Sequence, residues 1–188
     1  MENKERILET ALKLFSLQSY EAVGIQQVAV KAEVSKPTIY HYFESKRGLL
    51  DKLMAYYGTP YFKALEEAAR YKGDVKGTLT QVARIQLELA QKNEAYYRLY
   101  KSMSAMAAQS ESHQAARPYV EREYRILEHL FQAIAADHGN IRGRYRVYAA
   151  TFMGTLAVLV DLYANKIDYK DEDVHFRVIH SFMHGIFS

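Results

Sequence analysis

Apolar residues recur at spacings of three and four along almost the whole chain, and the strict alternation of a half-buried strand is scarce. This periodicity predicts an all-α fold. The first apolar face comprises Ile7, Leu8, Ala11, Leu14 and Phe15. Helices are predicted over residues 4–17, 25–32, 35–43, 45–57, 61–71, 74–92, 93–108, 118–137, 144–165 and 171–187.

Glycine, proline and polar clusters mark the predicted breaks between these helices. Gly58-Thr59-Pro60 is predicted to end one helix, because glycine suits a left-handed helix end and the residue before proline disfavours the helical region. The polar segment 109–114 is predicted to be a loop. Pro118 is then expected in the first turn of the following helix, where its missing N–H costs nothing.

An uncharged run, VYAATFMGTLAVLV, occupies residues 147–160 and stops at Asp161 after 14 residues. A membrane-spanning helix needs about 20. The pattern therefore favours a helix buried on most of its circumference over a membrane span.

Composition excludes some chemistry and leaves other questions open. The chain contains no cysteine, which excludes disulfides, thiol nucleophiles and Cys-ligated metals. Its net charge is only +3, so any phosphate-binding surface must come from the placement of charges and not from their total. The opening residues lack the features of a signal peptide, and a cytoplasmic location is expected.

Residues 25–43 have the pattern of two short helices joined by a turn at Glu33-Val34. Ser35 can cap the second helix, and Pro37 lies in its first turn. Ile39 and Phe43 are predicted to face the core. The opposite face carries the polar and aromatic residues that a recognition helix in a major groove requires: Lys36, Thr38, Tyr40, His41 and Tyr42. The alternative is a purely structural helical hairpin.

The segment GIQQVAVKAEVSKPTIYHYFESKRGLLDKL resembles the DNA-binding domain of the TetR (tetracycline-repressor-like) family of bacterial regulators. The resemblance rests on the opening helix, the Ile25-to-Ala29 helix, the turn, Tyr40-to-Phe43 and Ser45-Lys46. Two departures are visible. Glu33 stands where glycine is usual, which implies strain if its φ is positive. Val23-Gly24 replaces the usual Ser/Thr that caps the second helix.

The resemblance implies a helix-turn-helix DNA-binding domain at residues 1–52, built from three helices, and a helical effector-binding and dimerisation domain at 53–188. Gln26 would reach a phosphate or base edge, and Lys46 a phosphate. Lys36, Pro37, Thr38 and Tyr40 would face the major groove, whereas His41 and Tyr42 would contact the DNA backbone. Alternatively, the Tyr42 side chain could be partly packed in the core. Core positions by the same resemblance are Ala29, Val34, Ile39, Phe43, Leu49 and Leu50.

Two further surfaces are expected in the second domain. The helix at 144–165 is apolar on nearly every side, so a second copy is expected to cover it, although burial within one monomer is the alternative. The predicted dimer interface contains Leu127, Phe131, Thr151, Gly154, Ala157 and Val158. The predicted pocket for a small apolar or aromatic effector contains Tyr96, Tyr100, Met103, Met106 and Tyr124, with ordinary core packing as the alternative.

No cofactor, metal site or enzymatic centre is predicted. His180 and His184 are four apart, with His175 nearby, but no carboxylate lies at a matching spacing, so surface or packed histidines are favoured. No glycine-rich phosphate loop or nucleophile elbow is present.

The sequence thus predicts a cytoplasmic, nucleoid-associated bacterial regulator. It would be a homodimer that binds double-stranded operator DNA, acts as a repressor and makes no membrane contact. A helical small-molecule-binding or scaffolding protein without DNA binding is the alternative function.

Overall fold

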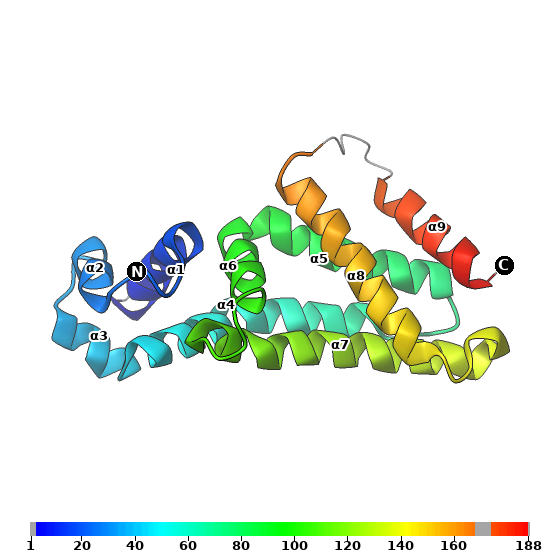
Figure 1. The fold of residues 1–188 in the computed structure, drawn as a ribbon, viewed down its shortest axis with the longest axis horizontal. Helices are drawn as coiled ribbons and strands as arrows, with labels where there is room; N and C mark the ends of the chain where they lie inside the picture. The colour runs from blue at the N-terminus through cyan, green and yellow to red at the C-terminus, as the bar shows by residue number, and fades with distance from the viewer. Residues whose placement is uncertain (1–2, 168–173, 188) are drawn as a thin grey trace. The chain divides into compact units, whose positions relative to one another are not determined.

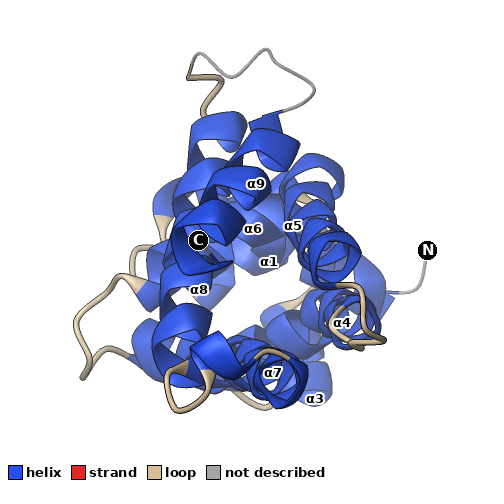
Figure 2. Ribbon diagram, turned by 90° about the vertical axis from the view of Figure 1, so that its right-hand side faces the viewer, coloured by secondary structure: helices blue, strands red, loops and turns tan. Residues whose placement is uncertain are grey.

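The computed structural model describes residues 3–167 and 174–187, and within these ranges its regular elements are all helical (Figure 2). This confirms the predicted all-α fold. The elements in chain order are α1 (Asn3–Gln18), α2 (Ile25–Lys31), α3 (Lys36–Phe43), α4 (Lys46–Ala68), α5 (Val75–Lys92), α6 (Glu94–Ser104), α7 (Glu111–Asp137), the 3₁₀ turn η1 (Gly139–Ile141), α8 (Tyr145–Ala164) and α9 (Val174–Phe187).

The chain forms two compact units that divide it differently from the boundary predicted after residue 52. The first unit contains Met1–Pro60 and Asn93–Val120, and the second contains Tyr61–Lys92 and Glu121–Ser188. In the first unit α1 packs against α2 and α6, and α2 packs against α3 (Figure 1). The N-terminal helices therefore share their core with a helix that begins more than 40 residues beyond the predicted boundary.

The core of the first unit follows the predicted apolar faces closely. Ile39, Phe43, Ala29, Leu49 and Leu50 are all buried, as predicted. Val34 is only half-buried. The remaining large core side chains come mainly from α1, α4 and α6 and include Ile7, Phe15, Leu53, Met54 and Tyr96.

The helix break predicted at Gly58-Thr59-Pro60 is wrong, because α4 continues through it to Ala68. A side chain at position 58 would collide with the hydroxyl of Tyr96. Gly58 is therefore required by this close approach and not by a helix end. Pro60 has no N–H to donate to the Tyr56 carbonyl one turn earlier. The neighbouring Thr59 hydroxyl donates to the Ala55 carbonyl at 2.6 Å.

The predicted start of the next long helix is also wrong. Ser110 caps α7 by accepting from the His113 amide at 3.2 Å, so the helix begins at Glu111, inside the segment predicted as a loop. Pro118 consequently lies within α7 and not in its first turn.

The second unit is built around α5, which packs against α8 and α9 (Figure 1). Phe131 of α7 and Phe152 of α8 make an edge-to-face contact with ring centroids 5.6 Å apart. This unit also buries one polar pair, in which the Gln86 amide donates to a Glu123 carboxylate oxygen at 2.7 Å.

The turn between α2 and α3 contains the strained residue that the sequence suggested. The Val34 amide donates to the Ala29 carbonyl at 3.0 Å and the Glu33 amide to Val30 at 3.2 Å. These two bonds form a Schellman motif, which places Glu33 at the left-handed position with φ of 52°. A side chain there costs about 1–2 kcal/mol relative to glycine.

Replacing Glu33 with glycine is expected to stabilise the protein by about 0.5–1 kcal/mol, because relief of the left-handed cost exceeds the added chain entropy of the unfolded state. Urea unfolding measures this difference. Glu33→Ala removes the same charge but keeps the Cβ, and it should give no gain. Equal stabilisation by both variants would assign the effect to charge and contradict the strain.

Candidate nucleic-acid interface

Helix α3 is positioned by its cap and by two buried side chains. The Ser35 hydroxyl accepts from the Thr38 amide at 3.2 Å and lies 2.8 Å from the Thr38 hydroxyl. Pro37 occupies the first turn, as predicted. Ile39 and Phe43 are 0% and 2% exposed, so one face of α3 is fixed in the core. Its opposite face must then point outward.

That outward face contains the residues predicted to contact DNA. Tyr40 and Tyr42 are 41% and 38% exposed, although large aromatic rings are ordinarily buried. Lys36, Pro37 and His41 are also exposed, and Thr38 is half-buried. On α2, Gln26 is exposed as well. These seven side chains combine cationic, hydroxyl, amide and aromatic groups on one short motif.

Two contacts that involve aromatic rings lie on this face. The Lys36 ammonium lies 5.9 Å from the centroid of the Tyr40 ring, one helical turn away. His41 and Tyr42 meet edge to face, with centroids 5.3 Å apart. Such a surface can donate hydrogen bonds to base edges and phosphates and offer ring edges to thymine methyl groups.

Lys46 is half-buried and contacts its own domain. It lies at the N-terminus of α4, which Ser45 caps by accepting from the Gly48 amide at 2.8 Å. The Lys46 ammonium lies 4.1 Å from the centroid of the Tyr20 ring and donates to the Glu21 carbonyl at 3.4 Å. Burial lowers the pKa of Lys46, and the carboxylates of Glu21 and Glu111 oppose this change.

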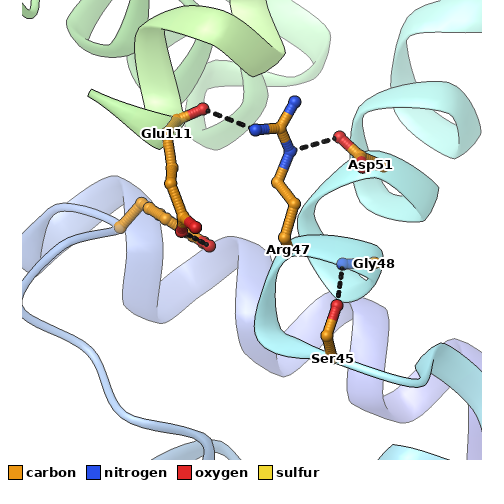
Figure 3. A network of polar contacts seen from close by, with 6 residues as sticks. Ser45, Arg47, Gly48, Asp51 and Glu111 are labelled. Atoms are coloured by element: carbon orange, nitrogen blue, oxygen red, sulfur yellow. Dashed lines mark hydrogen bonds and ion pairs between the residues drawn. The ribbon is translucent and has the colours of Figure 1, made fainter. Parts of the chain in front are cut away.

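Polar contacts join this region to the start of α7 (Figure 3). Arg47 donates from Nε to Asp51 at 2.9 Å and from Nη1 to the Glu111 carbonyl at 3.2 Å. The Tyr20 hydroxyl donates to the Glu111 carboxylate at 2.8 Å. Tyr20, Arg47 and Glu111 were not among the predicted site residues. No local pattern connects Tyr20 with a residue 91 positions away.

The predicted effector residues are not all in one place. Tyr96, Tyr100 and Met103 are buried together in the first unit, where the rings of Tyr96 and Tyr100 are nearly parallel with centroids 6.3 Å apart. Tyr57 adds a third ring, 6.1 Å from that of Tyr96. Met106, in contrast, is 40% exposed. Tyr124 is half-buried and belongs to the second unit.

The predicted dimer residues also divide into two groups. Leu127 and Phe131 are buried in the core of their own unit, and their part in a dimer interface stays a prediction. Thr151, Gly154 and Val158 of α8 are exposed, and Ala157 is half-buried.

By length and composition alone, α8 is long and apolar enough to cross a membrane. The uncharged run of 14 residues at 147–160 had suggested that it is too short. Its 20 residues include Phe152, Leu156, Leu159 and Val160, which are buried in the second unit. Only 28% of its most apolar window is buried, and Val147 and Val158 are 63% and 61% exposed. One side of α8 is therefore an open apolar surface.

His180 and His184 face each other on α9, with their Nε2 atoms 2.7 Å apart, so that one ring nitrogen donates to the other. Among the described residues, no group of three or more His, Cys, Asp or Glu side chains is arranged to hold a metal ion. The side chain of His175 lies outside the described part.

Comparison with known proteins agrees with this arrangement. Residues 7–53 match the family described as bacterial regulatory proteins, tetR family. An uncharacterized HTH-type transcriptional regulator of Bacillus subtilis, YuxN, is 28% identical over 163 residues, which cover 86% of this chain and 52% of YuxN. The chain therefore spans about half the length of this relative. The transcriptional repressor KstR of Rhodococcus jostii is 44% identical over 54 residues, covering 29% of this chain and 26% of KstR.

Solved structures of similar fold cover almost the whole chain. Bacillus subtilis FadR, solved in complex with stearoyl-CoA, has a TM-score of 0.77 at 20% identity and covers 97% of this chain and 98% of its own. AibR, solved with isovaleryl coenzyme A and operator DNA, has a TM-score of 0.71 at 19% identity, with coverage of 99% and 98%. These likenesses establish the fold.

Proposed function

Because this chain belongs to the TetR family of bacterial regulatory proteins, we propose that it is a sequence-specific DNA-binding transcriptional regulator, a repressor that a small-molecule effector releases from its operator. The observation that carries this proposal is α3 itself. Its apolar side is buried in the core, whereas Lys36, Pro37, Tyr40, His41 and Tyr42 remain accessible.

In this function α3 enters the major groove. Lys36 donates to guanine, Pro37 and the Thr38 methyl group contact thymine methyls, and Tyr40 reaches a base or the backbone. Gln26, His41 and Tyr42 contact phosphates, and the N-terminus of α4 offers its open N–H groups and Lys46 to another phosphate.

The protein acts as a homodimer whose second copy covers the open side of α8. Exposed apolar surface of this extent is costly in water, and a two-fold pairing of α8 would bury it twice. Thr151, Gly154 and Ala157 would allow close helix approach, and Val158 would supply apolar contact. Two copies would then place their α3 helices in successive major grooves, about 34–36 Å apart on a near-palindromic site.

The effector is a small molecule with a substantial apolar part, and its binding site includes the Tyr96–Tyr100 ring pair and Met103. Aromatic rings and an adaptable thioether suit such a ligand. Met106, which belongs to the same unit, remains a candidate member of this site. The acyl-CoA complexes of FadR and AibR make acyl-CoA thioesters the first class to test.

The alternative, a helical ligand-binding or scaffolding protein without DNA binding, leaves the exposed rings of α3 without a role. The relatives are regulators and not enzymes, and by family this chain is not an enzyme. The proposed function places it in the bacterial cytoplasm, on the DNA of the nucleoid.

The double variant Tyr40→Ala, Lys46→Ala is expected to lose at least about tenfold in operator affinity, because one base or backbone contact and one phosphate contact disappear. Fluorescence anisotropy with a duplex selected from a randomised pool measures this loss. The matched control is Tyr56→Ala, Lys63→Ala, which removes an exposed tyrosine and a lysine elsewhere on α4. The wild type must also bind more weakly as salt rises. Affinity indifferent to salt would contradict DNA binding.

Val158→Asp is expected to convert the dimer to a monomer, since it places two charges in the proposed apolar interface. Sedimentation velocity measures the change. Val30→Asp is the matched control, because Val30 is 65% exposed on α2 and should leave the dimer intact. A Val158→Asp protein that stays dimeric would overturn the α8 interface.

The double variant Tyr100→Ala, Met103→Ala is expected to abolish release from DNA by an acyl-CoA that releases the wild type, while DNA binding without ligand persists. Because both side chains are buried, the milder pair Tyr100→Phe, Met103→Leu provides a second measurement and should shift the half-maximal concentration severalfold. A full response in both double variants would show that the pocket lies elsewhere.

A further inference from the structure

The first turn of α7 contacts the helix-turn-helix module at three points. The Tyr20 hydroxyl donates to the Glu111 carboxylate. Arg47 donates to the Glu111 carbonyl (Figure 3). The Ser112 hydroxyl donates to the carboxylate of Glu21. We call these contacts of Glu111 and Ser112 the α7 latch. They fix both the turn after α1 and the first turn of α4.

The latch leads directly to a proposed phosphate contact. Tyr20 is only 2% exposed, and its ring carries the ammonium of Lys46 on one face while its hydroxyl is bound to Glu111. The carbonyl of Glu21 accepts from the same ammonium, and the carboxylate of Glu21 is held by Ser112. Both partners of Lys46 are thus held in place by the start of α7.

The latch also holds carboxylates in a region proposed to meet DNA. Glu21 and Glu111 each accept a hydrogen bond from a neutral hydroxyl, and Asp51 is paired with Arg47. Burial and the bond to Glu111 raise the pKa of Tyr20 far above its ordinary value, so the hydroxyl keeps its proton and remains a donor. Because this neutral hydroxyl donates to a charged carboxylate, the hydrogen bond is charge-assisted and stronger than one between two neutral groups.

We propose that Glu111 and Ser112 are positioning residues for DNA binding: the α7 latch holds Tyr20, Glu21 and Arg47 so that Lys46 and the start of α4 meet the DNA phosphate in register with α3. This inference rests on the proposed function and deepens it. The same helix continues to Asp137, among residues assigned to the second unit.

Simple electrostatics predicts the opposite result, which makes the inference testable. Removing Glu111 deletes a negative charge near a polyanion and should strengthen binding if charge alone matters. If the α7 latch positions the phosphate contact, removing Glu111 breaks the latch, and the affinity for DNA should fall. Tyr20→Phe separates the two effects, because it keeps every charge and the ring beneath Lys46 and removes only the hydroxyl.

The experiment measures affinity for the selected duplex with wild type, Glu111→Ala, Tyr20→Phe and the double variant. Each single variant is expected to bind at least about fivefold more weakly, the low end of typical coupling between sites, and the double variant no more weakly than the worse single one. Glu111→Gln retains an acceptor for Tyr20 and should recover most of the affinity.

Glu94→Ala is the matched control, since Glu94 is also the first residue of a capped helix in the same unit and forms an ion pair with Arg98 on its own helix. It should bind DNA as the wild type does, or slightly more tightly. Thermal unfolding of each variant shows whether a loss of affinity reflects loss of the fold, and Tyr20→Phe is the variant least able to cause unfolding.

A second readout follows from linkage, because DNA that requires the latch must in turn stabilise it. Hydrogen exchange of the amides at 113–115 should slow several-fold when the duplex is added, and this slowing should be absent in Tyr20→Phe. The proposed role of the α7 latch is wrong if Glu111→Ala and Tyr20→Phe bind DNA as tightly as Glu94→Ala does. It is also wrong if the affinity losses of the two single variants are additive in the double variant. Wild type that binds no duplex would instead overturn the proposed function.

Discussion

The burial of Ile39 and Phe43 is the constraint on which the rest of the structure depends. These two side chains are four residues apart on a helix of only eight, so fixing both in the core fixes the rotation of α3 about its axis. Tyr40, His41 and Tyr42 must then project outward, whatever the cost of exposing their rings. A slip of one position would bury Tyr40 and move Ile39 toward water.

The elements around α3 maintain this orientation, although one turn residue adopts an unfavourable backbone conformation. The Schellman turn holds Glu33 in an unfavourable backbone conformation, and the Ser35 side chain accepts a hydrogen bond from the free amide of Thr38. On the other side, Ser45 starts α4 and the α7 latch holds the adjacent side chains. The motif is therefore anchored at both ends of α3 by backbone and polar contacts that are independent of the apolar core.

The elements that could be predicted from sequence are those whose cause is local. The apolar period identified the helices among the described residues, although it divided α4 into two, and Ser35 and Pro37 marked a helix start that the structure retains. The errors arose where a distant residue overrides a local signal. Gly58-Thr59-Pro60 has the local pattern of a helix end, but α4 continues through it, and the missing side chain of Gly58 leaves room for the hydroxyl of Tyr96.

Other features were beyond the reach of any sequence pattern. Leu127 and Phe131 lie on a helix whose apolar surface is wide, and periodicity alone cannot assign them to core or interface. The exposed ridge of α3 was identifiable because its polar side chains share one face of a short, well-marked helix. The contacts that hold Lys46 in place could not be identified from sequence, because they involve residues up to 91 positions apart that share no sequence pattern.

The most direct test of the central claim is methylation protection of the operator duplex by dimethyl sulfate, which reacts at guanine N7 in the major groove and at adenine N3 in the minor groove. If α3 presents its polar face to the major groove, the bound protein protects guanines in two clusters, with centres about one helical turn or a multiple of it apart. Protection confined to adenine N3, or bound DNA whose guanines all react as freely as in the naked duplex, would contradict it.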